Sequence, residues 1–407
     1  MNAALHFSDT GTQAPATKVE FTDRSHATAT ARGPGTVILA GGGTGGHVLP
    51  ALALADAFVA RLGVRVVFIG TAKGLEATLV PKRGYPFEVV QGTRLVGGGA
   101  RQKFEGLRSL ISGVREARAL LRQHGADLVV GVGGYASGAA LLAARSLGIP
   151  TAIHESNAVA GFTNKVLGHL VDRVYLGFAA AEADFARDVT VLSGNPVRAA
   201  ITAVGAHRLA PAQSHGLAGS WAHAVRPARV LVVGGSQGSQ FLNSQVPDLL
   251  ARVQALGIAL EVRHQVGRQP PEPVAERYAS LGLAATVETF IDDMAAAYAW
   301  ADTAVTRSGS GTVAELAAAA LPALLVPFPH AAGDHQTANA RAFAAAGAGT
   351  WVREAAWNEA ALARVMADLL RDRPSWLAAA KAAWVLGNRD AAGAVVDDCA
   401  RWMEGRW

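Results

Sequence analysis

The sequence predicts an α/β fold made of two doubly wound units with parallel sheets. Three observations support this prediction. From residue 36 onward, short apolar segments typical of buried strands alternate with helical segments. Glycine-rich loops follow several of these strands, and the whole pattern starts again at Arg229. Ligands of such sheets bind beyond the carboxyl ends of the strands, so the glycine loops are the first places to look for a site.

The composition narrows the class of protein. A chain of 407 residues is long for one core, so we expect two domains. The net charge of +5 suits anionic small molecules or an anionic membrane surface. It is too weak and scattered to indicate nucleic acid, and no base-stacking aromatic cluster accompanies it. The single cysteine, Cys399, allows no internal disulfide or cysteine-based metal site and fits a reducing cytosol.

The first 33 residues are rich in Thr, Ala, Ser and Gly without periodicity, so we expect a disordered tail over 1–33. The polar start lacks the apolar core of a signal peptide. The uncharged run from Gly35 to Ala55 is long enough to span a membrane, but six glycines, a histidine and a proline interrupt it. We therefore expect no transmembrane segment there.

The first unit is predicted from alternating strands and helices. Strand 37–40 leads through a glycine loop, 41–47, into helix 48–61, with Pro50 in its first turn. Then come strand 65–69, a segment 75–80, helix 104–123, strand 128–130, a second glycine loop 131–135, helix 137–147 and strand 151–153. The last strand ends in His154-Glu155-Ser156-Asn157.

The first glycine loop has the form that binds anions, because a helix that starts after it exposes unpaired backbone N–H groups. Gly41, Gly43 and Gly46 even fit the dinucleotide fingerprint. That fingerprint needs an acidic residue at the end of the next strand, yet Gly70-Thr71-Ala72 follows Ile69. The loop is not a Walker phosphate-binding loop either, because no Gly-Lys-Ser/Thr sequence follows it. The loop therefore binds something other than NAD in the usual way, or it is only a tight turn.

The second unit repeats the pattern after a boundary at 194–198 and a stretch of low order over roughly 205–227. Strand 229–233 precedes a glycine loop, 234–239. Strand 303–306, helix 312–316 and strand 323–326 follow, and a polar segment covers 334–339. The final helices are expected at 374–385 and 391–404. Two similar units that face each other across a cleft are the simplest interpretation.

Seven motifs in order resemble one family. They are Gly42-Gly43-Thr44-Gly45-Gly46-His47, Gly131-Val132-Gly133-Gly134-Tyr135, His154-Glu155-Ser156-Asn157, Gly194-Asn195-Pro196-Val197-Arg198, Gly234-Gly235-Ser236-Gln237-Gly238, Phe290-Ile291-Asp292-Asp293-Met294 and Arg307-Ser308-Gly309-Ser310-Gly311-Thr312. Together they resemble the GT-B glycosyltransferases of peptidoglycan synthesis. The resemblance implies an acceptor and membrane-side domain over 34–198 that includes a last helix at about 388–404. A UDP-sugar domain would cover 199–387.

The resemblance also implies a reaction. N-acetylglucosamine would move, with inversion, from UDP-N-acetylglucosamine to the C4 hydroxyl of undecaprenyl-pyrophosphoryl-N-acetylmuramoyl-pentapeptide. The implied location is peripheral, at the cytoplasmic face of the bacterial inner membrane, near other cell-wall synthesis proteins. Three alternatives stay open: a GT-B enzyme with another glycolipid acceptor, a nicotinamide-dependent oxidoreductase built on the 41–46 loop, and a non-catalytic sugar-nucleotide-binding protein.

Such a transfer needs a base, stabilisation of the leaving diphosphate, and alignment of the substrates. Asp292-Asp293 is not an Asp-x-Asp metal motif at a strand end, so we expect no metal and no cofactor, with helix N-termini supplying positive potential. His47 is the expected base because it lies where the loop opens and titrates near neutrality. Glu155 is the rival base, or else an organiser of its loop.

The resemblance assigns the donor contacts. Glu315 would accept hydrogen bonds from the ribose hydroxyls, although Thr312-x-x-Glu315 also fits a purely structural capping box. Ser156 stands where the family usually has Gln, so no side-chain contact is assigned there. The other expected contacts are Thr44, Gly45, Gly46, Asn157, Arg198, Ser236, Ile291 through its backbone, Ser310, Gly311, Thr312, Val313, Ala314 and Gln336.

Tyr135 in the second glycine loop is a candidate acceptor residue. Phe104 and Leu107 begin a series of apolar residues at helical spacing, with basic residues around it. A basic amphipathic helix of this kind either lies on an anionic bilayer or packs against the core with a solvated face.

Overall fold

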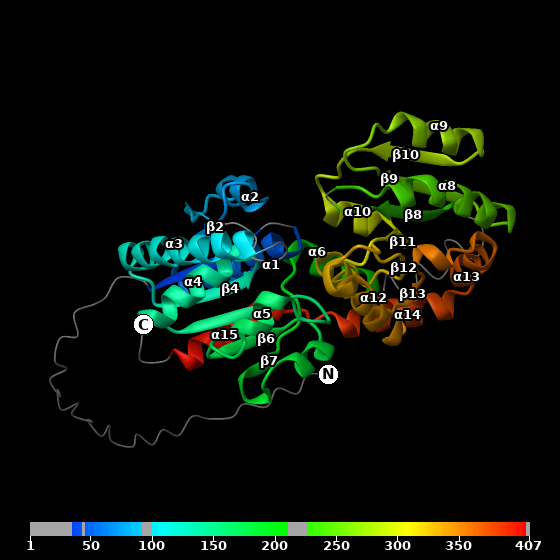
Figure 1. Ribbon diagram of the computed structural model, residues 1–407. Helices are drawn as coiled ribbons and strands as arrows, with labels where there is room; N and C mark the ends of the chain where they lie inside the picture. Colours follow the sequence, from blue (N-terminus) through cyan, green and yellow to red (C-terminus); the bar gives the residue numbers. More distant parts are fainter. Residues whose placement is uncertain (1–34, 43–44, 92–99, 211–225, 236, 404–407) are drawn as a thin grey trace, which may run out of the picture. The chain divides into compact units, whose positions relative to one another are not determined.

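The computed structural model describes residues 35–42, 45–91, 100–210, 226–235 and 237–403 (Figure 1). The predicted disordered tail lies outside these ranges. Two parallel sheets organise the described chain, as the sequence predicts. No helix within these ranges is both long and apolar enough to cross a bilayer.

The first sheet has seven parallel strands in the order β3-β2-β1-β4-β5-β6-β7. The central strand β1 is buried along its whole length, with Val37 paired to Val66 on one side and Leu128 on the other. The sequence analysis missed β3, β6 and β7, because they are short and two of them are only partly buried. The strands are β1 (Thr36–Gly41), β2 (Arg65–Gly70), β3 (Phe87–Val89), β4 (Leu128–Gly133), β5 (Thr151–Glu155), β6 (Arg173–Leu176) and β7 (Thr190–Leu192).

Helices cover both faces of this sheet. Val37 and Leu39 of β1 join one hydrophobic cluster, whereas Ile38 and Ala40 join the other, as strand alternation requires. The first cluster includes α1 (Gly45–Leu62), α2 (Glu76–Lys82) and α15 (Ala391–Trp402). The second includes α3 (Ala100–His124), α4 (Tyr135–Ser146) and α5 (Phe162–Leu167). The short helices η1 (Ala179–Asp184) and η2 (Arg187–Val189) precede β7.

Helix α1 begins earlier than the sequence predicts. It starts at Gly45, inside the glycine loop, so the expectation that Pro50 lies in the first turn is wrong. Pro50 lies within the helix and has no N–H group, which leaves the carbonyl of Gly46 without its usual intrahelical partner. The second glycine segment also differs from expectation, because β4 continues as far as Gly133.

The second sheet has six parallel strands in the order β10-β9-β8-β11-β12-β13. They are β8 (Ala228–Val233), β9 (Leu260–Gln265), β10 (Ala284–Glu288), β11 (Thr303–Thr306), β12 (Ala323–Leu325) and β13 (Gly349–Trp351). One face carries α8 (Gln240–Ala255), α9 (Glu272–Ser280) and α13 (Glu359–Arg371). The other carries α6 (Ala199–Leu209), α10 (Met294–Trp300), α11 (Ser310–Ala318), α12 (His335–Ala345) and α14 (Arg373–Leu386). Two short helices are η3 (Ala332–Asp334) and η4 (Glu354–Ala356).

Helix α6 corrects the expectation of low order from residue 205. Its last turn reaches Leu209, while residues 211–225 of that stretch lie outside the described ranges. Arg208 anchors the turn, since its buried guanidinium donates hydrogen bonds to the carbonyls of Tyr298, Ala301 and Ala319. A charged side chain with carbonyl partners can be buried, and a polar sequence pattern does not reveal such partners.

The last helix, α15, packs against the first sheet although it follows the second sheet in the chain (Figure 1). The Tyr175 hydroxyl of β6 donates to Asp398 Oδ2 at 2.9 Å. Arg61 at the end of α1 forms ion pairs with Asp390 and Asp397. The buried side chains of Val395 and Cys399 complete the cluster beneath these polar contacts.

Candidate active site

The two glycine segments of the first unit pack backbone against backbone. The Gly42 N–H donates to the Gly133 carbonyl at 3.3 Å. A Cβ atom at Gly41 would lie 2.5 Å from the same carbonyl, and one at Gly134 would lie 3.0 Å from the Gly42 carbonyl. Gly41 and Gly134 also have positive φ angles, so only glycine fits here without strain. This approach of β1 and β4 makes the floor of the site.

His47 lies in the first turn of α1 and rests on this floor. A Cβ atom at Gly133 would lie 2.9 Å from its Cε1 and 3.0 Å from its Nδ1, so the missing side chain makes room for the imidazole. The side chain is half-buried, and its Nδ1 has no hydrogen-bond partner among the described residues. The ring therefore keeps one nitrogen free of the described part of the chain.

Burial lowers the pKa of His47 below its ordinary value. The negative charge of Glu155 opposes this effect, His335 adds to it, and the backbone of Val132 and the charge of Glu76 oppose it further. His47 is therefore a neutral imidazole at neutral pH, which is the form that accepts a proton.

Glu155 ends β5 and is buried, and its carboxylate is surrounded by donors from the loop that follows and from α5. The N–H and the side-chain amide of Asn157 donate to Oε1 at 2.8 and 3.0 Å. The N–H of Gly161 and the side-chain amide of Asn164 donate to Oε2 at 3.0 and 2.8 Å. Four donors on one carboxylate favour the loop-organising role of Glu155 over the role of base.

His154, the neighbour of Glu155, faces the connection between the two sheets. Its Nε2 lies 3.2 Å from the Gly194 carbonyl, and its Nδ1 lies 3.2 Å from Ser156 Oγ. Burial lowers the pKa of His154, so it too is neutral. The Asn195 amide donates to the Ser156 carbonyl at 2.9 Å. The end of β5 is thus tied to the segment that leads into the second unit.

Glu315 lies in α11, and its surroundings correct one expectation. The helix begins at Ser310 after an N-cap at Gly309 that forms no side-chain cap, so the capping box from Thr312 to Glu315 is wrong. A capping box needs its first residue at the N-cap, whereas Thr312 is the third residue of the helix. Glu315 instead accepts from Arg198 Nη2 at 2.9 Å and from the Tyr298 hydroxyl at 3.0 Å.

The carboxylate of Glu315 is almost fully buried, and this burial raises its pKa, while Arg198 and Tyr298 oppose the rise. Each carboxylate oxygen has one protein donor and can accept a further hydrogen bond. Arg198 is therefore ion-paired and not simply solvated, and its Nε is buried without a partner among the described residues.

The first turns of α1 and α11 approach each other. A Cβ atom at Gly311 would lie 3.8 Å from Gly46 Cα. Ser310, Val313 and Ala314 are buried, whereas Gly311 and Thr312 of the same turn are half-buried. The unpaired N–H groups of two helix starts thus meet at one place and create a positive potential there.

A buried asparagine links the two units beside this place. Asn339 of α12 accepts from the Ala158 N–H at 2.8 Å and donates to Asn157 Oδ1 at 3.2 Å and to the Ser308 carbonyl at 3.1 Å. The sequence analysis noted only that Asn339 belongs to a polar segment. No sequence signal distinguishes a buried amide with these partners from a solvated one.

Gln336 lies at the start of α12, one residue after its N-terminus. Its Oε1 accepts from the Phe328 N–H at 3.0 Å, and its backbone carbonyl accepts from Ser308 Oγ at 2.8 Å. Arg307, which is not among the expected site residues, contacts the backbone that leads from β12 to Phe328. Its Nη1 donates to the carbonyls of Val326 and Pro327 at 3.1 and 3.2 Å.

The remaining expected site residues are divided among the first turn of α1, other parts of the fold, and residues outside the described ranges. Thr44 and Ser236 are outside the described ranges. Gly45 is the first residue of α1, and Ile291 is a buried core residue. Tyr135 starts α4 with its hydroxyl 3.3 Å from Ser109 Oγ. Phe104 and Leu107 belong to α3, but their side chains are outside the described part.

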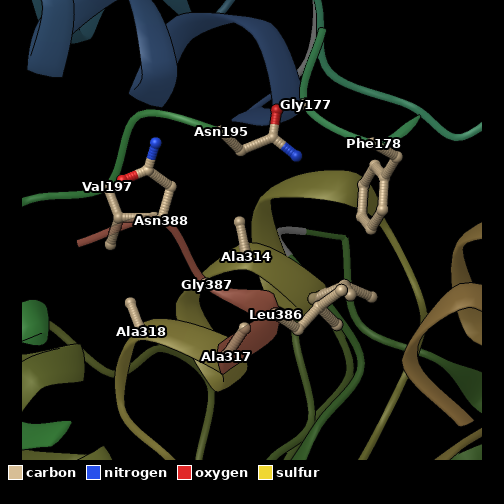
Figure 2. Close-up of a pocket in the computed structure, with 11 residues that line it drawn as sticks. Gly177, Phe178, Asn195, Val197, Ala314, Ala317, Ala318, Leu386, Gly387 and Asn388 are labelled. Atoms are coloured by element: carbon tan, nitrogen blue, oxygen red, sulfur yellow. The ribbon is translucent and has the colours of Figure 1, made fainter. Parts of the chain in front are cut away.

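A small pocket lies next to α11 (Figure 2). Ala314, Ala317 and Ala318 line it from the helix, and Asn195 and Asn388 come from the two connections between the sheets. Neither His47 nor Glu315 lines this pocket, so we do not assign the proposed reaction to it. Across the described ranges, no group of three or more His, Cys, Asp or Glu side chains could hold a metal ion.

The two parallel α/β units, together with the matching family models and a similar solved structure, place this chain among the glycosyltransferases of the GT-B class. Within that class, the chain belongs to glycosyltransferase family 28. The N-terminal domain of this family matches residues 37–176, and its C-terminal domain matches residues 229–395. The resemblance and the fold class predicted from the sequence are therefore confirmed.

The relatives share almost their whole length with this chain. One from Aeromonas hydrophila is 42% identical over 373 residues, which are 91% of this chain and 98% of the relative. One from Geobacter metallireducens is 39% identical over 363 residues, which are 89% of this chain and 97% of the relative. Both are named UDP-N-acetylglucosamine–N-acetylmuramyl-(pentapeptide) pyrophosphoryl-undecaprenol N-acetylglucosamine transferase, and the chain belongs to their family.

Solved structures agree with this assignment. MurG of Acinetobacter baumannii is 32% identical with a TM-score of 0.73, covering 90% of this chain and all of that one (100%). The glycosyltransferase of kitacinnamycin is 17% identical with a TM-score of 0.64, and the match covers 91% of this chain and 99% of that one. At this identity the similarity supports the fold alone.

Proposed function

We propose that this protein transfers N-acetylglucosamine from UDP-N-acetylglucosamine to the C4 hydroxyl of undecaprenyl-pyrophosphoryl-N-acetylmuramoyl-pentapeptide, with inversion at the anomeric carbon. The observation that carries the proposal is the approach of the first turns of α1 and α11, which brings a neutral His47 to the place where helix N-termini attract a diphosphate. The names of relatives that share nearly the whole chain supply the substrates. This membership also favours a transferase over a nicotinamide-dependent enzyme.

In the proposed step, His47 accepts the proton of the C4 hydroxyl as its oxygen attacks the anomeric carbon. The bond from that carbon to the diphosphate oxygen breaks, and UDP leaves with the bonding electrons. The unpaired N–H groups of the two helix starts stabilise the new charge on the diphosphate. The loop held by Glu155 keeps Asn157 beside the donor, while Glu155 itself has its oxygens occupied.

The donor would lie against the second unit. Glu315 is placed to accept the ribose hydroxyls with the remaining capacity of its oxygens, and Arg198 holds that carboxylate in position. Gln336 would contact the sugar. We infer a metal-independent reaction, since Asp293 of the acidic pair is already engaged as the N-cap of α10, accepting from the Ala296 N–H at 2.9 Å.

We further propose that the protein works as a peripheral protein on the cytoplasmic face of the bacterial inner membrane, where a lipid-linked acceptor is available. Helix α3 supports this location. Ile111 is 46% exposed, and Arg108 and Arg115 lie one turn away on either side. Exposed apolar and basic groups on one helix face suit an anionic bilayer.

The test of the reaction uses labelled UDP-N-acetylglucosamine and a short-chain lipid-linked muramyl-pentapeptide in the presence of EDTA. The parent protein should transfer the label, and His47→Ala should lose nearly all transfer, whereas His169→Ala, at an exposed histidine of the same unit, should behave as the parent. Tight UDP binding without transfer would refute this acceptor and favour another glycolipid. Transfer that requires added metal would refute the metal-independent step.

A further inference from the structure

A buried carboxylate lies behind the first glycine loop. Glu76 is the first residue of α2, and only 1% of its surface is exposed. Its Oε1 accepts from the N–H and the hydroxyl of Thr71, at 3.1 and 2.8 Å. A carboxylate loses much hydration energy when it is buried, so its retention at such a place needs specific partners or a specific use.

Three glycines make room for this side chain. A Cβ atom at Gly42, or one at Gly74, would overlap the Glu76 carboxylate, and one at Gly70 would lie 2.7 Å from Glu76 Cγ. Gly42 belongs to the loop after β1, and Gly70 ends β2. Backbone from two neighbouring strand ends thus closes around one carboxylate, which fixes its position.

The Gly42 N–H donates to the Gly133 carbonyl, and Gly133 lies against the His47 imidazole, so the Glu76 carboxylate is within electrostatic reach of that ring. The groups that influence His47 are Glu155 and Glu76, which raise its pKa, and His335, which lowers it. His154 is also within electrostatic reach. Glu155 has the larger influence on the pKa of His47, and Glu76, held by the N–H and hydroxyl of Thr71, adds to it in the same direction.

We propose that Glu76 is a positioning residue of the transfer reaction: its buried side chain fills the space between Gly42, Gly70 and Gly74 and keeps a fixed negative charge behind His47. This inference rests on the proposed function for its catalytic consequence. When His47 takes the acceptor proton, it becomes a cation, and a fixed carboxylate stabilises that cation in the transition state. The motifs that identify the family do not include Glu76.

The test compares Glu76→Gln with the parent protein. Glutamine keeps the shape and can still accept from Thr71, but it removes the charge. Two readouts are needed. The first is the titration of His47 followed by NMR on histidine-labelled protein without substrates, with the resonance assigned through His47→Gln. The second is the pH dependence of kcat and of the KM for UDP-N-acetylglucosamine.

We expect His47 to titrate at lower pH in Glu76→Gln, because the charge that favours its protonated form is gone. The acid limb of the kcat profile should move to lower pH, and the plateau kcat should fall about tenfold or more, with KM for the donor little changed. The matched control is Glu88→Gln, since Glu88 pairs with His124 elsewhere in the same unit. This control should leave both readouts at the parent values.

Unchanged titration of His47 in a folded Glu76→Gln variant would overturn the inference, because a purely structural glutamate lowers the melting temperature without moving that titration. If Glu76→Gln does not fold, Gly74→Ala displaces the carboxylate from its place, and it should shift His47 in the same direction. The NMR readout needs no turnover. A parent protein that transfers no sugar would therefore refute the proposed function without deciding the inference, which the titration decides.

Discussion

At the scale of single residues, the site separates two carboxylates and one histidine into different tasks. His47 is neutral and has room over Gly133, while Glu155 is saturated by donors from the loop that follows it and from α5. Glu315 is buried, with Arg198 and Tyr298 on its two oxygens. Burial and hydrogen bonding, more than residue type, decide which group can exchange a proton and which can only hold a partner.

Glu315→Gln should weaken UDP binding. A hydrogen bond to a charged group contributes about 1.5–3 kcal/mol, so we expect the Kd for UDP to rise by roughly 10- to 150-fold. Isothermal titration calorimetry with UDP measures this change. Glu359→Gln, at a half-buried glutamate of the same unit that pairs with Arg252, is the matched control. An unchanged Kd would remove Glu315 from the donor site.

At the scale of elements, the proposed chemistry belongs to helices that start at the carboxyl edges of the sheets, and the proposed membrane contact belongs to α3. Helix α15 completes the hydrophobic cluster of the first sheet although its sequence follows the second. Helix α3 presents Ile111 and Arg108 on its exposed side. We therefore make one prediction about stability from α15 and one about membrane binding from α3.

The double substitution Phe104→Ser/Leu107→Ser should reduce binding to vesicles that contain anionic lipid, while activity on a soluble short-chain acceptor stays intact. The apolar residues of a basic amphipathic helix supply the area buried in the bilayer. Vesicle co-sedimentation at low and high salt measures the binding. Val365→Ser/Val385→Ser removes two exposed apolar side chains from the second unit and serves as the control. Equal vesicle binding by both variants and the parent would exclude α3 as the membrane contact.

Val395→Ser should destabilise the protein by about 2–4 kcal/mol, because it buries a hydroxyl and leaves a small cavity where α15 meets α1. Val395 is fully buried in the cluster of the first sheet. Urea unfolding measures the loss, and Ala400→Ser, at a half-buried position of the same helix, should cost much less. Similar losses for both variants would show that α15 is not part of this core.

At the scale of the whole molecule, the fold keeps three histidines neutral by burial. The pKa of His47 and of His154 lies below the ordinary value, and burial lowers the pKa of His264 to about 3. His264 is held between the Tyr278 hydroxyl at 2.9 Å and Asn243 Oδ1 at 3.1 Å. Burial makes protonation of each of these rings less favourable in the folded protein than in the unfolded chain.

The protein should therefore lose stability in mild acid. In the unfolded chain these histidines titrate near pH 6.5, so below that pH the unfolded state binds more protons than the folded state. The free energy of unfolding should fall as pH drops from about 6.5 to 5, above the range where ordinary carboxylates titrate. Glu315, with its raised pKa, opposes this slope.

Melting temperatures between pH 7.5 and 5 test this prediction. The parent should lose stability progressively below about pH 6.5, and His264→Gln, though less stable at pH 7.5, should show a shallower pH slope because one of the three groups is gone. A melting temperature that stays constant over this range would contradict the assignment of neutral buried histidines.

Much of the architecture was open to prediction from local patterns. Strand, glycine loop and helix succeed one another at 36–62 and again at 228–255, and buried strands need only a short apolar run to be recognised. Short edge strands such as β3 escaped, since a half-exposed Phe-Glu-Val segment has no distinctive pattern. The sequence predicts the start of α1 too late, because Gly45 and Gly46 have low helix propensity and are typical of turns.

The sequence by itself determined the α/β class, the repeated glycine loops, the family and the candidate residues His47, Glu155 and Glu315, because short motifs and their order along the chain are enough to recognise each of them. Only the tertiary structure decided which of them act together. The pairing of Arg198 with Glu315, the link from Asn339 to Asn157 and the enclosure of Glu76 by three glycines join residues from different elements. Such contacts arise when strands and helices pack, and packing is set by the whole chain at once.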